Sequence, residues 1–169
     1  MCIRDRSYSQ LDRASVQLVD VTEGLESTLV MLAHKLKNGI SVERDYGEDV
    51  PRIEAFAGEL NQVWTNLIDN AIDAMDGEGT LLVSTRPQGD GVVVEIADTG
   101  HGFPEAVQTH AFEPFFTTKD VGEGTGLGLD ISRRIVVDRH GGEITIDSRP
   151  GETVLRVRLP ARPSGPTAP

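Results

Sequence analysis

A stripe of polar side chains follows one side of a strongly periodic helical segment. It consists of Glu59, Gln62, Asn66, Asn70 and Asp73, whose spacings of three and four residues place them on one helix face. Asparagine is a poor helix former, costing about 0.5–0.7 kcal/mol relative to alanine. A solvated face would explain one asparagine. Two on one stripe favour a face turned toward a ligand, where amide oxygens can reach a hard cation.

The segment DTGHG comes directly after a run that alternates like a strand. It places Asp98 at the strand end, with Gly100 and Gly102 close behind. A carboxylate there can accept a hydrogen bond from an exocyclic amine, which distinguishes adenine from guanine, and the glycines let backbone approach a ligand closely. Aspartate and glycine are also ordinary turn residues, so a turn would explain this motif if it stood alone.

Two further motifs lie in an irregular stretch of the chain. FEPFFTTK holds three of the five phenylalanines and ends at Lys119. Either its aromatic residues pin a loop to the core, or they dock a lid that offers Lys119 to a phosphate. GEGTGLGL then leads into a helical segment, whose first backbone N–H groups can bind an anion. No Gly-Lys-Ser/Thr is present and no strand precedes, which excludes a P-loop and a dinucleotide-binding fingerprint.

Periodicity predicts the elements that must position these motifs. Helices are expected at 21–37, 59–75 and 126–140, and strands at 40–46, 80–85, 92–97, 143–147 and 153–159. The second helix has the clearest apolar face, formed by Leu60, Val63, Trp64, Leu67, Ile68, Ala71, Ile72 and Met75. The third and fourth strands are expected to form a hairpin around 87–91. This order predicts an α+β fold in which helices cover one face of a sheet.

Composition limits the possible functions. The 169 residues are enough for one domain. With 27 acidic and 16 basic residues, the net charge is −11, so we expect no nucleic-acid partner and no contact of this segment with a membrane. Cys2 is the only cysteine, which excludes an internal disulfide and a cysteine-rich metal site. The absence of a long apolar run or a signal peptide predicts a cytoplasmic location, although the full-length protein could carry a membrane anchor.

Taken in order, the four motifs resemble those of the ATP-binding catalytic domain of bacterial sensor histidine kinases, in the group that includes gyrase, Hsp90 and MutL ATPases. NLIDNAIDAM is similar to the N box, DTGHG to the first glycine box, FEPFFTTK to the phenylalanine box and GEGTGLGLDISRRI to the second glycine box. The resemblance covers residues 20–160. It implies a two-layer α/β sandwich of the Bergerat type, with a mixed sheet covered on one face by helices and a long ATP lid at 104–125. Residues 1–19 are then a remnant of an upstream helical region or a spurious start, and 161–169 a disordered tail.

The resemblance also implies roles for single residues. Asn70 would hold the Mg²⁺ that bridges the ATP phosphates, and Asp98 would bind the adenine amine in a pocket that Gly100 and Gly102 open. Thr153 would lie near the adenine. The complete set of implied ATP-binding residues is Asn66, Asn70, Asp73, Asp98, Gly100, Gly102, Lys119, Gly124, Thr125, Gly126, Leu127, Gly128 and Thr153.

Two positions bear on the reaction. ATP-hydrolysing members of the group carry a glutamate as general base where this chain has Asn66, and an amide cannot act as that base. The resemblance therefore implies ATP-dependent phosphoryl transfer to another nucleophile. Many sensor kinases carry lysine or arginine where this chain has Asp73, so Lys119 or Arg133 would have to supply that phosphate contact.

The chain's histidines do not match a phosphoacceptor. His34 lacks the glutamate and proline that follow the acceptor in the family, and His101, His110 and His140 are expected in loops or at a helix end. The resemblance thus implies a kinase fragment whose partners are a dimerisation domain that carries the acceptor histidine and the receiver domain of a response regulator. Two alternatives stay open at this point: a serine kinase of the anti-sigma type, and a nucleotide-sensing module without catalysis.

Overall fold

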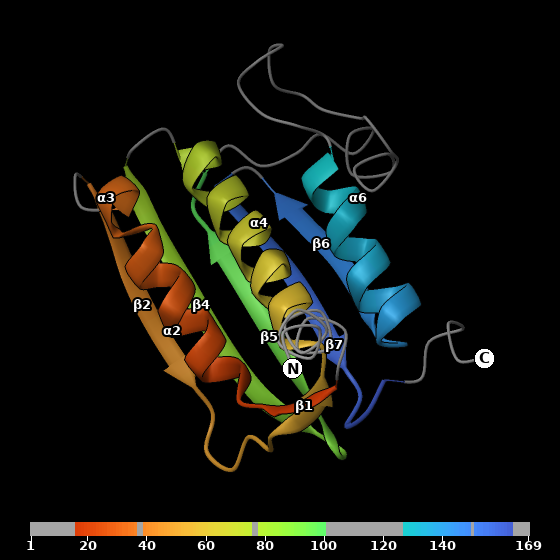
Figure 1. Cartoon of the computed structure of the whole chain (residues 1–169). Helices are drawn as coiled ribbons and strands as arrows, with labels where there is room; N and C mark the ends of the chain where they lie inside the picture. The colour runs from red at the N-terminus through yellow and green to blue at the C-terminus, as the bar shows by residue number, and fades with distance from the viewer. Residues whose placement is uncertain (1–15, 37–38, 76–77, 101–126, 150, 164–169) are drawn as a thin grey trace, which may run out of the picture.

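The computed structural model describes residues 16–36, 39–75, 78–100, 127–149 and 151–163 (Figure 1). Its main sheet has five strands in the order β2-β4-β5-β7-β6. They are β2 (Ile40–Tyr46), β4 (Gly79–Gln88), β5 (Gly91–Asp98), β6 (Glu143–Arg149) and β7 (Glu152–Leu159). Strands β2 and β4 are parallel and the other pairs antiparallel. The predicted mixed sheet is confirmed.

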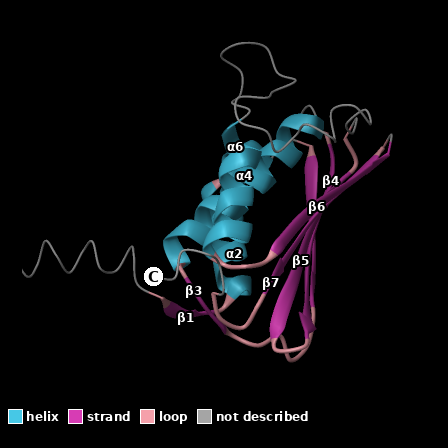
Figure 2. Cartoon of the chain, turned by 90° about the vertical axis from the view of Figure 1, so that its right-hand side faces the viewer, coloured by secondary structure: helices cyan, strands magenta, loops and turns pink. Residues whose placement is uncertain are grey.

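Three helices lie side by side on one face of this sheet, as Figure 2 shows. They are α2 (Val21–Met31), α4 (Ala57–Met75) and α6 (Leu127–Arg133), with α4 in the middle. A short helix α3 (Ala33–Leu36) follows α2, and a π-helical segment η1 (Arg134–Arg139) continues α6. The two-layer α+β sandwich expected from the sequence is therefore the observed architecture.

The core lies between the helices and the sheet. The apolar face of α4 is buried over its whole length, at the eight positions that the periodicity predicted. It packs against inward-facing side chains of the central strands, among them Leu81, Val94, Ile96 and Val157. The opposite face of the sheet carries ion pairs, such as those of Glu95 with Arg86 and Arg156. One buried face and one charged face explain the alternating pattern of the strands.

Several boundaries differ from those predicted. The first helix begins at an N-cap, where the Asp20 side chain accepts a hydrogen bond from Thr22 N at 2.9 Å, but its α-helical hydrogen bonding stops at Leu32. The hairpin turn is tighter than expected, since β4 extends to Gln88 and β5 starts at Gly91. The helix predicted at 126–140 changes to π-helical geometry at Arg134.

Two short strands were not predicted. Strand β1 (Gln17–Val19) pairs antiparallel with β3 (Ile53–Ala55) and links the start of the described chain to the residues before α4. Strands of three residues are too short to show an alternating pattern, so periodicity could not predict them. Beyond β7, Ala161 O accepts a hydrogen bond from Glu54 N at 2.8 Å.

Candidate functional site

The end of α4 and the end of β5 meet at one edge of the sheet. Asp98 is the last residue of β5, and the chain then turns at Gly100 against the last turn of α4. A Cβ atom at Gly100 would lie 2.4 Å from Ala74 O, closer than atoms of that kind can approach. Only glycine therefore allows this contact, which brings Asp98, Thr99 and Gly100 beside the end of α4.

Asp98 is buried and oriented by its own loop. Its side chain is 4% exposed, and Oδ1 accepts a hydrogen bond from Gly100 N at 2.8 Å. In the sheet, Asp98 is the partner of Thr153 on β7, and Thr153 is 3% exposed. Partners in an antiparallel pair point to the same face, so both side chains point toward the helical layer. A carboxylate and a hydroxyl are thus held side by side in the interior.

The loop after β5 is also tied to the strand next to it. Thr99 Oγ1 accepts a hydrogen bond from Thr80 N at 3.0 Å. The residue before Thr80, Gly79, leaves room for the Thr99 side chain, because a Cβ atom at Gly79 would lie 2.5 Å from Thr99 Oγ1. The position of Asp98 is therefore set from both sides, by β4 and by α4.

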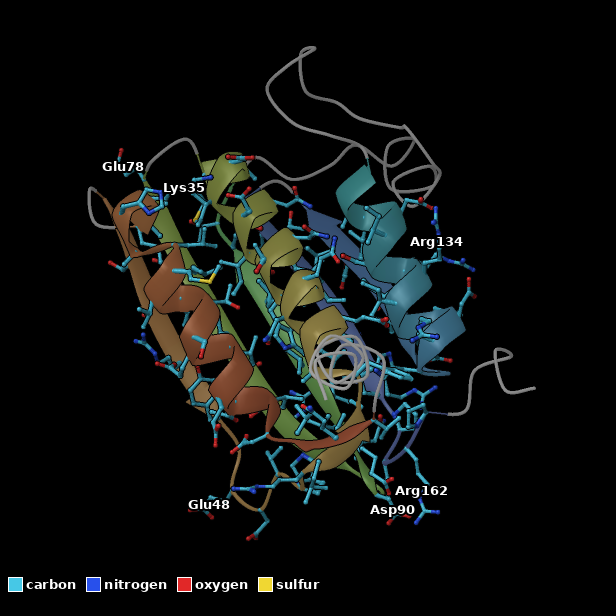
Figure 3. All side chains as sticks on the ribbon, viewed as in Figure 1. Lys35, Glu48, Glu78, Asp90, Arg134 and Arg162 are labelled. Atoms are coloured by element: carbon cyan, nitrogen blue, oxygen red, sulfur yellow. The ribbon has the colours of Figure 1, made fainter. Side chains whose placement is uncertain are left out.

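The polar stripe of α4 lies on the face away from the core. Asn66 and Asn70 are half-buried and Asp73 is exposed. Asn66 Nδ2 donates a hydrogen bond of 3.4 Å to Ser132 Oγ on α6, and Ser132 is fully buried. The stripe therefore runs along the seam between α4 and α6. Leu127 and Gly128, two of the predicted site residues, are the first residues of α6. Figure 3 shows the polar side chains along this seam.

The donor set on this seam suits Mg²⁺. Among the residues that the structure describes, no group of three or more histidine, cysteine, aspartate or glutamate side chains could hold a metal ion. Mg²⁺ does not require such a group, because it keeps several waters and binds through one or two protein oxygens together with substrate phosphates. The half-buried Asn70 supplies an amide oxygen in such a setting, so the residues present fit a magnesium ion that arrives with a nucleotide.

The remaining predicted site residues lie outside the described part of the chain. These are Gly102, Lys119, Gly124, Thr125 and Gly126, together with the expected lid at 104–125. Arg133, named above as a substitute phosphate contact, is exposed on α6. Its neighbour Arg134 pairs with Asp130 at 2.6 Å.

One cation near the stripe was missed by sequence reasoning. Lys35 Nζ on α3 binds Asp69 Oδ1 on α4 at 2.7 Å. The hydrogen bond to Asp69 raises the pKa of Lys35, and the charge of Asp73 raises it further, against the opposing effect of burial. The two residues are 34 positions apart, so only the packing of α3 on α4 reveals the pair. This ion pair places the positive charge of Lys35 beside Asp73, the acidic end of the stripe.

A family described as "Histidine kinase-, DNA gyrase B-, and HSP90-like ATPase" matches residues 57–163. The chain is 36% identical over 170 aligned positions to the sensor kinase CckA of Brucella abortus, covering 91% of this chain and 18% of CckA. It therefore spans less than a fifth of that relative's length.

Solved structures agree in fold. The catalytic domain of the histidine kinase ThkA superimposes with a TM-score of 0.80 at 33% identity, covering 88% of this chain and 97% of that domain. Full-length ShkA in complex with AMPPNP superimposes with a TM-score of 0.77 at 25% identity, covering 89% of this chain and 32% of ShkA. ThkA bound to the response regulator TrrA gives a TM-score of 0.74 at 28% identity, covering 88% of this chain and 42% of that one.

Proposed function

The chain belongs to the family of histidine kinase-, DNA gyrase B- and HSP90-like ATPases, and we propose that it is the ATP-binding catalytic domain of a sensor histidine kinase. The observation that carries this proposal is the contact of Gly100 with Ala74, which brings the buried Asp98 beside the amide stripe of α4. An acceptor for adenine and an oxygen donor for a metal then lie at the same edge of the domain. The AMPPNP complex of ShkA supports this assignment.

In this proposal Asp98 selects adenine. Its carboxylate has two oxygens with several acceptor positions, so it can hold Gly100 N and also accept from the exocyclic amine of adenine. Guanine presents a carbonyl oxygen at the equivalent place, which a buried carboxylate would repel. Thr153, paired with Asp98 across the sheet, contributes a hydroxyl to the same pocket. Gly100 and Gly102 are expected to open this pocket.

The phosphates would lie along the seam between α4 and α6. Asn70 would hold Mg²⁺, which would bridge the phosphates and reduce their charge. The backbone at Gly124, Thr125, Gly126, Leu127 and Gly128 would face the phosphates, with Lys119 as a further cation from the lid. Phosphoryl transfer depends mainly on such positioning and charge neutralisation, so the proposal requires no further covalent chemistry by the chain.

The attacking nucleophile would come from another domain. Asn66, which donates to Ser132, has no basic atom that could activate water, so the bound ATP would be kept for transfer rather than hydrolysed. We propose that the acceptor is a histidine on the dimerisation domain of the same kinase, and that the phosphoryl group then passes to a response regulator. The complex of ThkA with TrrA supports this choice of partner.

The proposed location is the cytoplasm, where ATP and response regulators are found. Within the described ranges, no helix is both long enough and apolar enough to cross a membrane.

Mixing the chain with labelled Mg-ATP and a separately produced dimerisation domain of a related kinase tests the assignment. We expect label on that domain that is lost in acid and kept in base, as for a phosphohistidine. Label that resists acid would instead indicate a serine kinase. ATP binding without transfer to any acceptor would favour a nucleotide-sensing module.

A further inference from the structure

The end of η1 is joined to the start of α4 by a buried histidine. His140 follows η1 and is 1% exposed. Its Nε2 accepts a hydrogen bond from Phe56 N at 3.1 Å, and its Nδ1 lies 2.7 Å from Ile135 O. A carbonyl oxygen can only accept, so Nδ1 carries the proton and the ring is the neutral Nδ1–H tautomer. Both ring nitrogens are used, and protonation of Nε2 would remove the hydrogen bond from Phe56 N while Nδ1 continues to donate to Ile135 O.

Three neighbouring side chains complete this connection. Arg139 makes two hydrogen bonds to the Glu59 carboxylate on α4, at 2.9 and 3.1 Å. The Arg139 guanidinium also lies over the Phe56 ring, 4.2 Å from its centroid, and the rings of Phe56 and His140 meet edge to face at 5.3 Å. We refer to His140, Arg139, Phe56 and Glu59 as the clasp.

The clasp lies on the same seam as the candidate site. Glu59 and Asn66 belong to one polar stripe of α4, and Asn66 reaches Ser132, which precedes Arg139 by seven residues on the continuous helix α6–η1. The two helices are thus joined at the clasp by several contacts, and Asn66 and Ser132 are joined by a hydrogen bond of 3.4 Å. π-helical turns such as η1 are rare and occur often at functional sites.

We propose that His140 is a positioning residue of the nucleotide site, whose neutral ring holds η1 on the start of α4, so that protonation of the ring loosens the α4–α6 seam and lowers the affinity for ATP. This inference rests on the proposed function, because it assumes that the seam binds the phosphates. The step is a proton transfer from solvent to Nε2. It breaks the hydrogen bond from Phe56 N, since a protonated Nε2 cannot accept.

The charges around His140 set the direction of the effect. Burial lowers the pKa of His140, and the charge of Arg139 adds to this, while the hydrogen bond to Ile135 O and the charge of Glu59 oppose it. On the other elements nearby, Glu54 of β3 pairs with Arg162, and Glu143 of β6 pairs with Arg158 of β7. The ring is therefore neutral at neutral pH and takes up a proton only in acid.

A first experiment follows the ligand-free chain by NMR across a pH titration. We expect the ring nitrogens of His140 to report the Nδ1–H tautomer at about pH 8, and the signals of Asn66 and Ser132 to shift with the same midpoint as the ring. The proposal would be overturned if the signals of Asn66 and Ser132 did not change as the His140 ring is protonated. Because no nucleotide is present, this result is independent of whether the chain binds ATP.

A second experiment compares ATP affinity at several pH values in the wild-type chain, in His140→Gln and in His34→Gln. Glutamine can still accept from Phe56 N but does not titrate, whereas His34 is exposed on α3 and serves as the matched control. Below the His140 midpoint, wild type and His34→Gln should lose about tenfold more affinity per pH unit than His140→Gln, because binding then releases one proton. Equal losses in all three proteins would contradict the proposal.

Glu59→Gln gives a test that keeps the histidine. Removing the carboxylate should move the midpoint of the acid loss of ATP affinity to lower pH, because Glu59 favours the charged ring. If the midpoint of the acid loss of ATP affinity did not change, the proposed role of the clasp would be contradicted. If the folded wild-type chain binds no ATP even at about pH 8, the proposed function fails, and the ligand-free titration still decides whether the clasp controls the seam.

Discussion

Asp98 and Thr153 are directly paired across β5 and β7, and both are buried at the edge where α4 ends. A strand residue with a charged side chain is rarely buried without a partner, because removing a carboxylate from water is costly. Here Gly100 N donates to Asp98 Oδ1 at 2.8 Å, which offsets part of that cost. The pair is therefore a polar feature built into the core at the proposed adenine pocket.

Asp98→Asn should remove the preference for adenine. The asparagine Oδ1 can still accept from Gly100 N, but its Nδ2 faces the adenine amine with a donor instead of an acceptor. We expect ATP binding to weaken by about 1.5–3 kcal/mol, the range for a hydrogen bond to a charged group, with little loss for GTP. Competition binding with both nucleotides measures the ratio.

The matched control for this variant is Asp90→Asn, which changes the same chemical group in the exposed hairpin turn (Figure 3). Its ATP-to-GTP ratio should equal that of wild type. A ratio in Asp98→Asn that also stays at the wild-type value would remove the basis for placing adenine at Asp98.

Asn70→Ala should strongly reduce the contribution of Mg²⁺ to ATP binding. The substitution removes the amide oxygen assigned to the metal and leaves a helix-favouring residue in α4, so the fold should be kept. We expect the Mg²⁺-dependent gain in ATP affinity to fall by about tenfold or more, equivalent to about 1.4 kcal/mol. Gln62→Ala, an exposed position of the same stripe, should keep the full gain, and an intact gain in Asn70→Ala would show that the metal lies elsewhere.

Gly100→Ala tests the contact that joins the two motifs. The added methyl group would lie 2.4 Å from Ala74 O, and relieving such a clash costs about 1–3 kcal/mol. Thermal unfolding followed through Trp64, the one tryptophan of the chain and fully buried, measures the change. Gly58→Ala is the control, because nothing lies within 4 Å of the added atom and the site is in a helix. A Gly100→Ala chain as stable as wild type would mean that the loop does not pack on α4.

The charged face of the sheet should make the chain sensitive to acid. Burial would raise the pKa of Glu95, but the hydrogen bond and charge of Arg156, together with Arg86, lower it below its ordinary value. A carboxyl group with a lowered pKa stabilises the fold above its unfolded-state pKa, and this stability is lost as the pH falls through the folded-state value. The loss should therefore begin near the unfolded-state pKa of glutamate, about 4.3, and continue at lower pH.

Arg156→Gln should flatten this acid transition more than Arg86→Gln. The closer contact is that of Arg156 Nε with Glu95 Oε2, at 2.5 Å, against 3.3 Å for Arg86. Unfolding by denaturant at several pH values measures both variants. Equal effects of the two substitutions, or none, would show that the pairs on this face do not set the pKa of Glu95.

The sequence predicted best what depends on local pattern. The apolar face of α4 repeats without a gap, so the helix and its eight buried positions were found from spacing alone. The end of the strand at Asp98 was indicated by the pattern, but the contact of Gly100 with Ala74 was not predicted, because the approach of a loop to the end of a helix depends on the packing of the whole sheet. The same holds for Lys35 and Asp69, and for Asn66 and Ser132, which are joined only by tertiary structure.

His140 shows the limit most clearly. A histidine before two glycines was expected in a loop or at a helix end, and His140 does follow η1, but its ring is buried and accepts a hydrogen bond from Phe56 N. Neither the change of helix type nor the partner, 84 residues away, leaves a periodic signal. The residues of the candidate site could be proposed from the sequence because they form dense local motifs, whereas the contacts that position them could not be predicted.

The most direct test of the account is calorimetric titration of the chain with ATP, with and without Mg²⁺, alongside GTP. The account predicts that ATP binds at one site, that Mg²⁺ strengthens this binding, and that GTP binds much more weakly. Failure to bind ATP in a chain whose buried Trp64 reports the folded state, or equal binding of ATP and GTP, would contradict the assignment of Asp98 and Asn70 to a nucleotide site.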